Sequence, residues 1–258
     1  MKNIYKQEVK ASLEQIKNRK SGLITEEDLR ALPVIVQKYL RNCQVIGKQK
    51  VINFRVEMEG TMWSKPGESG MKIKSVQYNF IESCTRIFYI KAFKMGIPAA
   101  GLHLYKNETA IMKIKLAGLF TVADARGPEM DQGETVTVFN DMCFMAPGTL
   151  ISKNIKWEIL EPAVVKATFT NGHLTISAIL YFDNDGNLVN FISNDRFETQ
   201  GGKEYKNYPW STPVTEFREI DGIRRPAVAK AIYHRPEGDF FYAEFVIKDI
   251  KQNDFLLH

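Results

Sequence analysis

The chain of 258 residues is 44% hydrophobic and 25% charged, a composition typical of globular proteins, and its length suits one large domain or two small ones. The net charge of +5 comes from residues 1–50, where eleven Lys and Arg face five acids, and the rest of the chain sums to −1. Because a nucleic-acid groove needs basic residues in the folded body, this distribution argues against nucleic-acid binding. Cys43, Cys84 and Cys143 are far apart and form no CxxC pair, and the apolar neighbours of Cys84 and Cys143 predict that these two are small buried side chains.

No apolar run in the sequence approaches the roughly 18 residues that span a bilayer. The first twenty residues carry Glu8 and Glu14 among several lysines, and they lack the apolar stretch that a signal peptide needs. The sequence therefore predicts a cytoplasmic protein without a transmembrane segment.

Residues 1–48 have the pattern of helices. Over residues 3–18, apolar side chains recur at helical spacing and form one face, while lysines occupy much of the remainder. Thr25 is a predicted N-cap because three acids follow it, and Pro33 opens another helical piece that ends near Gly47. We expect the first helix to dock on its own domain; the alternative is a basic helix that lies on an anionic membrane or a partner. Its predicted inward residues are Tyr5, Val9, Leu13 and Ile16.

From Val51 the hydrophobic period changes to two, which predicts strands. About eleven or twelve such segments follow, most of them joined by short turns such as Pro66-Gly67 and Asn171-Gly172. The pattern predicts one α+β domain, mostly β, whose large antiparallel sheet curves into an open half-barrel with the N-terminal helices and one central helix on its concave face. The expected parts of this single domain, 1–258, are N-terminal helices at 1–48, a first strand meander at 49–125, the central helix at 126–150 and a second meander at 151–258.

The central segment, residues 119–148, reads as a strand, an acidic turn and a buried helix. Asp131 is the predicted N-cap and Glu134 completes a capping box, so capping explains most of the acidity. Asp141 is the acid that capping does not explain. The apolar face of the helix is expected to fill the concave side of the sheet. The alternatives for the acids are paired catalytic carboxylates or a hard-cation site, although their spacing fits no established metal motif.

Candidate ligand-binding residues are those that can turn toward the concave face. Arg86 and Arg196 lie within predicted strands, where an inward charge needs a partner such as Asp141 or an anionic ligand head group. His103 lies on a predicted strand and can point into the same groove. The segment 198–213 carries aromatic residues between glycines and is a candidate lid. The predicted ligand-binding set is Arg196, Asp141, His103, Arg86, Tyr205, Tyr208 and Trp210.

No motif in the sequence names a reaction. The chain has no Walker loop, no GxGxxG, no paired CxxC and no recognisable catalytic triad. The residues 183–186 predict a hairpin turn rather than a calcium loop, because later acidic ligands are missing. No metal and no cofactor are therefore predicted. The four histidines do not have the HxxxH or HExxH spacing of a metal site; they are His103, His173, His234 and His258.

A set of short motifs extends over about residues 30–250. They are Leu32-Pro33 with Tyr39-Leu40, Gly60 with Trp63, Gly118-Leu119, Met130-Asp131-Gln132-Gly133-Glu134, Pro147, Trp157, Asp185-Gly186, Arg196, Trp210, and Gly222 with Pro226. In these motifs the chain resembles an uncharacterised bacterial family known only as a domain of unknown function, which implies no established activity. That family carries Glu at the position of Asp141 and Arg at that of Thr137, which counts against a catalytic Arg–Glu pair on the central helix. The strand pattern is also similar to the open half-barrel of LolA-like lipoprotein carriers, an architectural likeness that transfers no function.

Three functions are consistent with the sequence. The leading hypothesis is a non-catalytic protein that binds an apolar or amphipathic small molecule in the concave face of the half-barrel. The second is a hydrolase- or lyase-like enzyme that uses Asp124, Asp131 or Asp141 with Arg196 in the same cavity. The third is an interaction module that acts through the basic N-terminal helix. The identity of the ligand and the oligomeric state stay open at this point.

Overall fold

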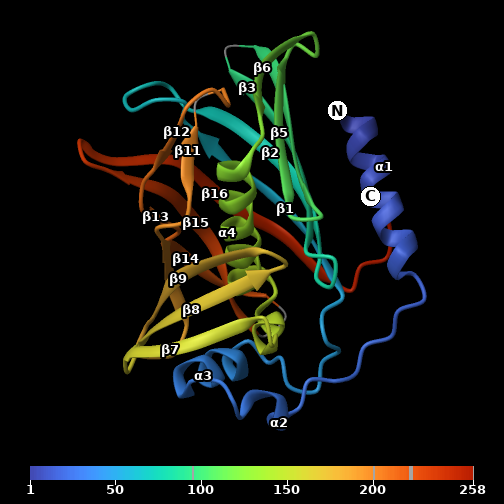
Figure 1. The fold of residues 1–258 in the computed structure, drawn as a ribbon, viewed down its shortest axis with the longest axis vertical. Helices are drawn as coiled ribbons and strands as arrows, with labels where there is room; N and C mark the ends of the chain where they lie inside the picture. The colour runs from blue at the N-terminus through green and yellow to red at the C-terminus, as the bar shows by residue number, and fades with distance from the viewer. Residues whose placement is uncertain (95, 200, 221–222, 258) are drawn as a thin grey trace.

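The computed structural model describes residues 1–94, 96–199, 201–220 and 223–257 (Figure 1). The motif residue Gly222 and the histidine His258 lie outside this part of the chain. The helices are α1 (Lys2–Ile16), α2 (Glu26–Leu29), α3 (Val34–Asn42), α4 (Pro128–Met145) and the 3-10 helix η1 (Pro147–Ile151). The strands are β1 (Asn53–Met62), β2 (Met71–Phe80), β3 (Thr85–Lys94), β4 (Ile97–Lys106), β5 (Thr109–Leu116), β6 (Phe120–Ala125), β7 (Ile155–Glu161), β8 (Val164–Asn171), β9 (Leu174–Phe182), β10 (Leu188–Ser193), β11 (Phe197–Thr199), β12 (Tyr205–Asn207), β13 (Trp210–Ser211), β14 (Val214–Ile220), β15 (Ile223–Arg235) and β16 (Gly238–Gln252).

One antiparallel sheet of fourteen strands joins the two meanders. Its order is β6-β5-β4-β3-β2-β1-β16-β15-β13-β10-β9-β8-β7, with β14 paired to β15, and β11 and β12 form a separate pair. The C-terminal strands β15 and β16 therefore lie between the two meanders, and β1 pairs with β16. The sheet is open because β6 and β7 are its two ends, and Figure 1 shows it wrapped around α4. The predicted class, a mostly-β α+β protein with a large open antiparallel sheet, is confirmed.

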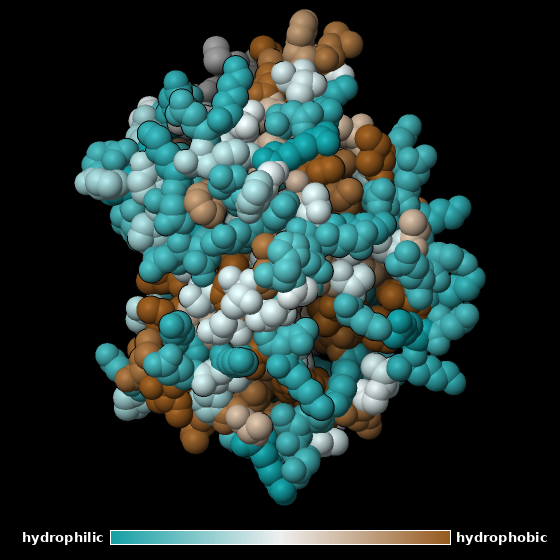
Figure 2. Space-filling view, viewed as in Figure 1, coloured by the Kyte–Doolittle hydropathy of each residue, from teal (hydrophilic) through white to brown (hydrophobic). Residues whose placement is uncertain are grey.

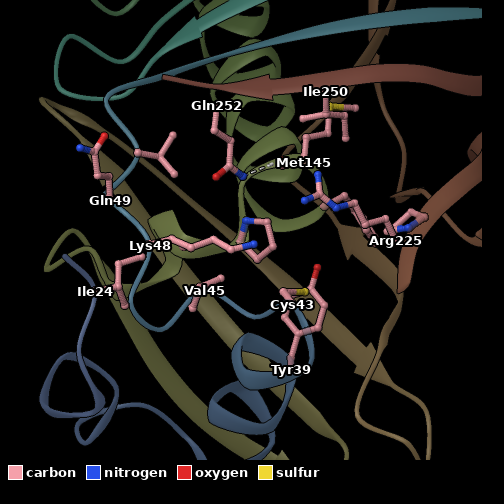
Figure 3. A pocket seen from close by; sticks show the side chains of 15 residues that line it. Ile24, Tyr39, Cys43, Val45, Lys48, Gln49, Met145, Arg225, Ile250 and Gln252 are labelled. Atoms are coloured by element: carbon pink, nitrogen blue, oxygen red, sulfur yellow. Dashed lines mark hydrogen bonds between the residues drawn. The ribbon is translucent and has the colours of Figure 1, made fainter. Parts of the chain in front are cut away.

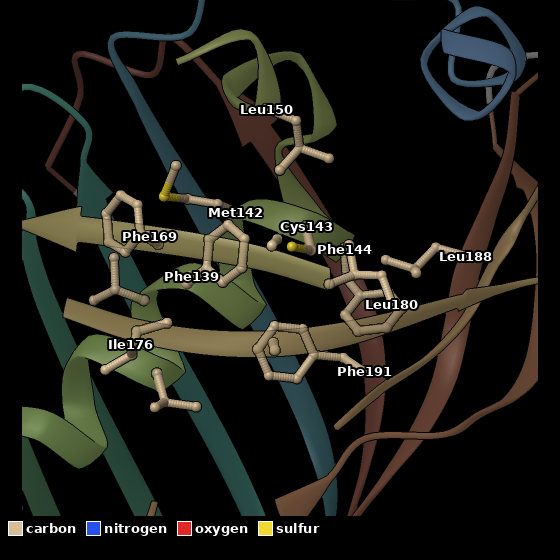
Figure 4. Packing of buried hydrophobic residues seen from close by; sticks show 14 of the residues in the cluster. Phe139, Met142, Cys143, Phe144, Leu150, Phe169, Ile176, Leu180, Leu188 and Phe191 are labelled. Carbon is tan, nitrogen blue, oxygen red and sulfur yellow. The ribbon is translucent and has the colours of Figure 1, made fainter. Parts of the chain in front are cut away.

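The helix α4 fills the concave side of the sheet. Every residue from Gly133 to Phe144 is buried, so α4 has no solvent face in its central turns. A helix buried on all sides is stable only when its apolar side chains pack in a core and its polar side chains find hydrogen-bond partners there. The ring of Phe139 stacks on Phe169 at 5.2 Å and lies 5.8 Å from Phe191, which anchors α4 against β8 and β10 (Figure 4).

The N-terminal helices divide between the two faces of the sheet. The predicted inward residues of α1 are all buried, and they pack against Tyr78 and Ile87. The neighbours Gln77 and Arg86 point to α4 instead, and alternate residues of a strand face opposite sides. The placement of α1 on the concave face was therefore wrong, because α1 covers the opposite face. The helices α2 and α3 do join the core of α4, where the hydroxyl of Tyr39 donates to the carbonyl of Cys143 at 2.8 Å.

Two predicted helix starts have different outcomes. The capping box at Thr25 is present, with Asp28 as its partner residue. The capping box predicted at Asp131 and Glu134 was wrong, because α4 begins four residues earlier than predicted, at Pro128, with Gly127 as its N-cap. Proline suits the first helical position, Pro128, and glycine readily adopts the φ of 106° that the chain has at the N-cap, Gly127. Both acids are consequently inside the helix, where they contact the sheet.

The three cysteines are free thiols, and the burial predicted for Cys84 and Cys143 is confirmed. Cys84 and Cys143 are buried and Cys43 is partly buried. Burial raises the pKa of Cys84 to about 12 and that of Cys43 to about 11, so both thiols keep their protons at neutral pH.

In the part of the chain that the structure describes, no helix is long and apolar enough to cross a bilayer.

Candidate functional site

A buried polar cluster joins α4 to the strands β2 and β3. It consists of Gln77, Asn79, Arg86, Glu134 and Asp141, each less than 9% exposed. One carboxylate oxygen of Asp141 accepts hydrogen bonds from Arg86 Nε at 2.7 Å, Gln77 Nε2 at 2.9 Å and Asn79 Nδ2 at 3.2 Å. The strands supply these donors because their concave positions alternate with the positions that α1 covers.

Glu134, about two helical turns nearer the start of α4, shares Arg86 with Asp141. Arg86 Nη1 donates to Glu134 at 3.1 Å, and His103 Nδ1 lies 3.6 Å from the other carboxylate oxygen. Burial by itself raises the pKa of Glu134, but the interaction with His103 and the charges of Arg86 and Arg196 lower it to about 2. Glu134 is therefore ionised at neutral pH.

Arg196 contacts α4 from the other side. Its Nη1 donates to the carbonyl of Gly133 at 2.7 Å and to the hydroxyl of Thr137, and its guanidinium lies 4.5 Å from the ring centre of Trp210. Its Nε is buried and has no hydrogen-bond partner. The guanidinium charges of Arg86 and Arg196 thus balance the two buried carboxylates of α4, Glu134 and Asp141, and of the two arginines only Arg86 forms ion pairs with them among the described residues.

This charge balance indicates a structural role for the cluster. A buried charge is stable only when it is paired and hydrogen-bonded, and here the partners are already inside the protein. His103 is the group closest to solvent, with a side chain that is 21% exposed. An external head group would have to displace Glu134 or Asp141 from Arg86.

The carboxylates of the enzyme hypothesis are dispersed. Asp124 pairs with Lys113 and Arg126, both at 3.0 Å, and Asp131 accepts a hydrogen bond from the backbone of β5. Asp141 contacts Arg86 and is 4% exposed. None of the three has a hydrogen bond or ion pair to Arg196 or His103 among the described residues, so the arrangement that this hypothesis needs is missing.

The aromatic residues predicted for a lid separate into different environments. Trp210 is buried in the sheet, where its Nε1 donates to the hydroxyl of Tyr242 at 3.0 Å. The hydroxyl of Tyr205 donates to the carbonyl of Arg126 at 2.9 Å, just before α4, and Tyr208 packs partly buried against the main core. The segment is therefore anchored to the chain around α4 by Tyr205 and to the sheet by Trp210.

A Ser–His–Asp chain of hydrogen bonds links β13, β15 and β16. Ser211 Oγ lies 2.8 Å from His234 Nε2, and His234 Nδ1 lies 2.7 Å from Asp239 Oδ1. The order of groups is that of an activated serine, and sequence spacing could not reveal it because three separate strands contribute. Ser211 is only 2% exposed, and none of the three residues lines either pocket described below. The contacts therefore fasten the two-residue strand β13 to its neighbours.

The principal pocket lies where α3, η1 and the end of α4 meet β15 and β16 (Figure 3). Its empty space, including the open mouth, is about 500 Å³, of which the centre of a water-sized sphere can occupy about 30 Å³. A water needs roughly 10–15 Å³ by that measure, so the enclosed part holds about two waters. A second pocket lies between Trp63 and Phe241 at the β1–β2 hairpin; water can enter more of its space, but it is more open to solvent than the principal pocket. The principal pocket is lined by Ile24, Tyr39, Cys43, Val45, Lys48, Gln49, Val51, Phe144, Met145, Pro147, Gly148, Arg225, Pro226, Ile250 and Gln252.

Two cations face the apolar walls of this pocket. In Figure 3 the side chains of Lys48 and Arg225 extend into it from opposite sides, and Gln252 donates to the carbonyl of Met145 at 3.4 Å along its upper edge. Neither cation forms an ion pair with another residue that the structure describes. Neither Lys48 nor Arg225 was predicted from the sequence, where the excess of basic residues in residues 1–50 was the single signal that pointed toward Lys48. In the described residues, no group of three His, Cys, Asp or Glu side chains could hold a metal ion.

Comparison with known proteins places the chain among its relatives. A family of unknown function, DUF6544, matches residues 22–245. The chain belongs to this family. The resemblance stated from the sequence is thus confirmed, and the DUF6544 family has no assigned activity. No curated protein matches the chain.

Two solved structures are similar to this DUF6544 chain. A DUF1329 family protein from Desulfovibrio piger aligns with a TM-score of 0.46 and 12% identity, over 86% of this chain and 93% of that chain. A LolA superfamily protein from Nitrosomonas europaea aligns with a TM-score of 0.46 and 11% identity, over 85% and 92%. Such likenesses transfer no function.

Proposed function

We propose that this DUF6544 protein binds a small amphipathic anion in the principal pocket. The head group contacts Lys48 and Arg225, and the apolar part of the ligand lies against Val45, Phe144 and Ile250. The observation that supports the proposal is a pair of cations at the edge of an apolar pocket that have no carboxylate partner among the described residues.

The chemistry of the walls defines the ligand. A cation beside apolar surface gains most from an anion that also excludes water, and a guanidinium suits carboxylates and phosphates. The pocket side chains away from the two cations, such as Val45, Phe144 and Ile250, are apolar. This favours a ligand whose remaining part is a hydrocarbon over one that carries a sugar or a second charge. The buried polar cluster takes no part, because its charges already compensate one another.

The dimensions of the pocket limit the ligand. The enclosed part holds about two waters, so a bound molecule lies mainly in the open mouth of the pocket, or α3 moves away from η1 to admit it. A medium-chain fatty acid such as octanoate therefore suits the site as a first probe, and a full-length lipid does not.

The test is a binding measurement on delipidated protein. Native mass spectrometry first shows whether the purified protein carries a ligand, and isothermal titration with octanoate then gives a Kd. Arg225→Gln and Lys48→Gln should each weaken binding about tenfold, because each removes one charge-assisted contact. Lys10→Gln on α1 is the matched control, since Lys10 is exposed and distant from the pocket lining, and it should leave Kd unchanged.

Two results would oppose the proposal. One is a clean apo mass together with no heat of binding for octanoate. The other is a Kd that both pocket variants leave at the value of the unmodified protein, which would place any bound ligand elsewhere.

A further inference from the structure

Large exposed apolar side chains gather where the β3–β4 and β5–β6 hairpins end. Five of them occur within thirty residues of sequence, and they make an apolar tip at one end of the sheet. Brown atoms mark this edge above β3 to β6 in Figure 2, which has the same orientation as Figure 1. Isolated exposed apolar residues are ordinary, but a group of this kind indicates an interaction site. The apolar tip consists of Phe93 (56% exposed), Ile97 (48%), Leu119 (78%), Phe120 (67%) and Val122 (52%).

The apolar tip surrounds the end of the sheet rather than covering one face. Phe93 and Ile87 are an even number of residues apart on β3, so Phe93 lies on the face of the sheet that α1 covers. Phe120 pairs with Leu116 of β5, and both lie on the face that α4 covers. Leu119 belongs to the turn between β5 and β6. A flat protein partner could cover one face of this tip but not both, whereas the interfacial layer of a bilayer can surround all of it.

Cations border the apolar tip, and acids are absent from its sequence. No Asp or Glu occurs in residues 84–107 or 109–123. Lys91 and Lys115 lie on the strands behind the tip and form no ion pair with other described residues, and Lys72 donates to the neutral hydroxyl of Thr61 at 3.1 Å. A surface of this charge is attracted to anionic lipid head groups, with a gain near each basic residue.

We propose that the apolar tip inserts into the interfacial layer of a membrane that contains anionic lipids. Leu119 and Phe120 enter furthest, because they are the most exposed, and the lysines remain at the level of the head groups. This docking surface is separate from the principal pocket, so the inference does not depend on the proposed ligand.

The experiment measures partitioning onto vesicles of phosphatidylcholine alone and of phosphatidylcholine with phosphatidylglycerol at a ratio of roughly 3:1, a content that gives an anionic surface. The unmodified protein should bind the anionic vesicles. Its partitioning onto the neutral vesicles should be weaker by at least about fivefold. Leu119→Ser with Phe120→Ser should lower partitioning about tenfold or more. In a separate variant, Phe120→Trp should show a blue-shifted fluorescence difference spectrum on binding.

The matched control is Ile159→Ser with Leu160→Ser on β7, at the opposite end of the sheet. These residues are 64% and 43% exposed, so the substitutions remove similar apolar surface and should leave partitioning unchanged. Circular dichroism and gel filtration verify that each variant is folded. The inference is overturned if the unmodified protein does not bind vesicles, or if the tip variant binds as strongly as the control. It is also overturned if the tip substitutions dissociate a dimer in the absence of lipid, since the tip would then pair two copies of the chain.

Discussion

At the scale of single residues, the decisive contacts are those of Arg86. Its guanidinium reaches Asp141, Glu134 and Gln77 at once, with distances of 2.7 to 3.1 Å. The sequence predicted that an inward arginine would need a partner such as Asp141, and this contact is present. Glu134 was assigned to a helix cap instead. Its place in the cluster follows from the true start of α4, which no local pattern of acids revealed.

The ionisation of Glu134 predicts how stability depends on pH. Its pKa is about 2 in the folded protein and 4.5 in its ordinary state, so its stabilising contribution is complete above pH 4.5 and is lost as the pH falls toward 2. The loss is of the order of 3 kcal/mol. Urea unfolding at several values between pH 6 and pH 2.5 should show this decline.

The variant Glu134→Gln isolates this contribution. It should be less stable at pH 6 and should lose less stability on acidification, because its side chain does not titrate. Exposed carboxylates such as Asp124 titrate equally in both proteins and cancel in the comparison. Parallel pH profiles for the two proteins would mean that Glu134 does not carry the effect.

At the scale of elements, β1 depends on a close approach that one glycine permits. A Cβ built on Gly60 would lie 1.9 Å from the carbonyl oxygen of Glu244 on the paired strand β16. A side chain at this position therefore forces β1 and β16 apart. Because β1 connects the first meander to the C-terminal strands, this separation disturbs the centre of the sheet.

We predict that Gly60→Ala lowers the free energy of unfolding by about 1–3 kcal/mol, the usual range for forced overpacking. Gly22→Ala is the control, because nothing lies within 4 Å of a Cβ built there, and its effect should be below about 0.5 kcal/mol. Both are measured by denaturant unfolding. Equal midpoints for the two variants would show that β1 and β16 separate without cost.

At the scale of the whole molecule, the chain is joined by contacts between its two ends. The strand β1 pairs with β16 in a register that runs from Phe54 opposite Gln252 to Met62 opposite Ala243. Asn53 also donates to the carbonyl of Asp254 at 2.6 Å. The sheet is therefore complete only when the last strands are in place, and such long-range pairing is expected to slow folding.

Removal of residues 1–20 tests the role of α1 in this whole. The helix buries Tyr5, Val9 and Leu13 against β2 to β4, so its deletion exposes Tyr78 and other apolar side chains. We expect a lower midpoint of thermal unfolding and increased binding of a hydrophobic dye, because the buried apolar area is lost. Unchanged stability would contradict this and would support the alternative in which the basic helix serves a partner or a membrane.

The sequence alone determined the local elements of this protein. A hydrophobic period of two and the acids after Thr25 act over a few neighbouring residues, so they can be recognised without knowledge of the fold. The turn predicted at Asn171-Gly172 is displaced by one residue, because Asn171 pairs with Leu174 and the turn is made by Gly172 and His173. The same is true of the membership in a family, which short motifs carry. The sequence likewise showed that the apolar residues of α1 share one face, and all four are buried.

Only the tertiary structure decided which face each helix covers, which strands become neighbours and which charges pair. Alternation gives every strand two faces but does not say that α1 takes one and α4 the other. The neighbours β1 and β16 are separated by most of the chain, and the pocket cations Lys48 and Arg225 come from its two ends. These arrangements depend on the burial of apolar area and the pairing of charges across the whole molecule, so the spacing of residues within a short segment does not predict them.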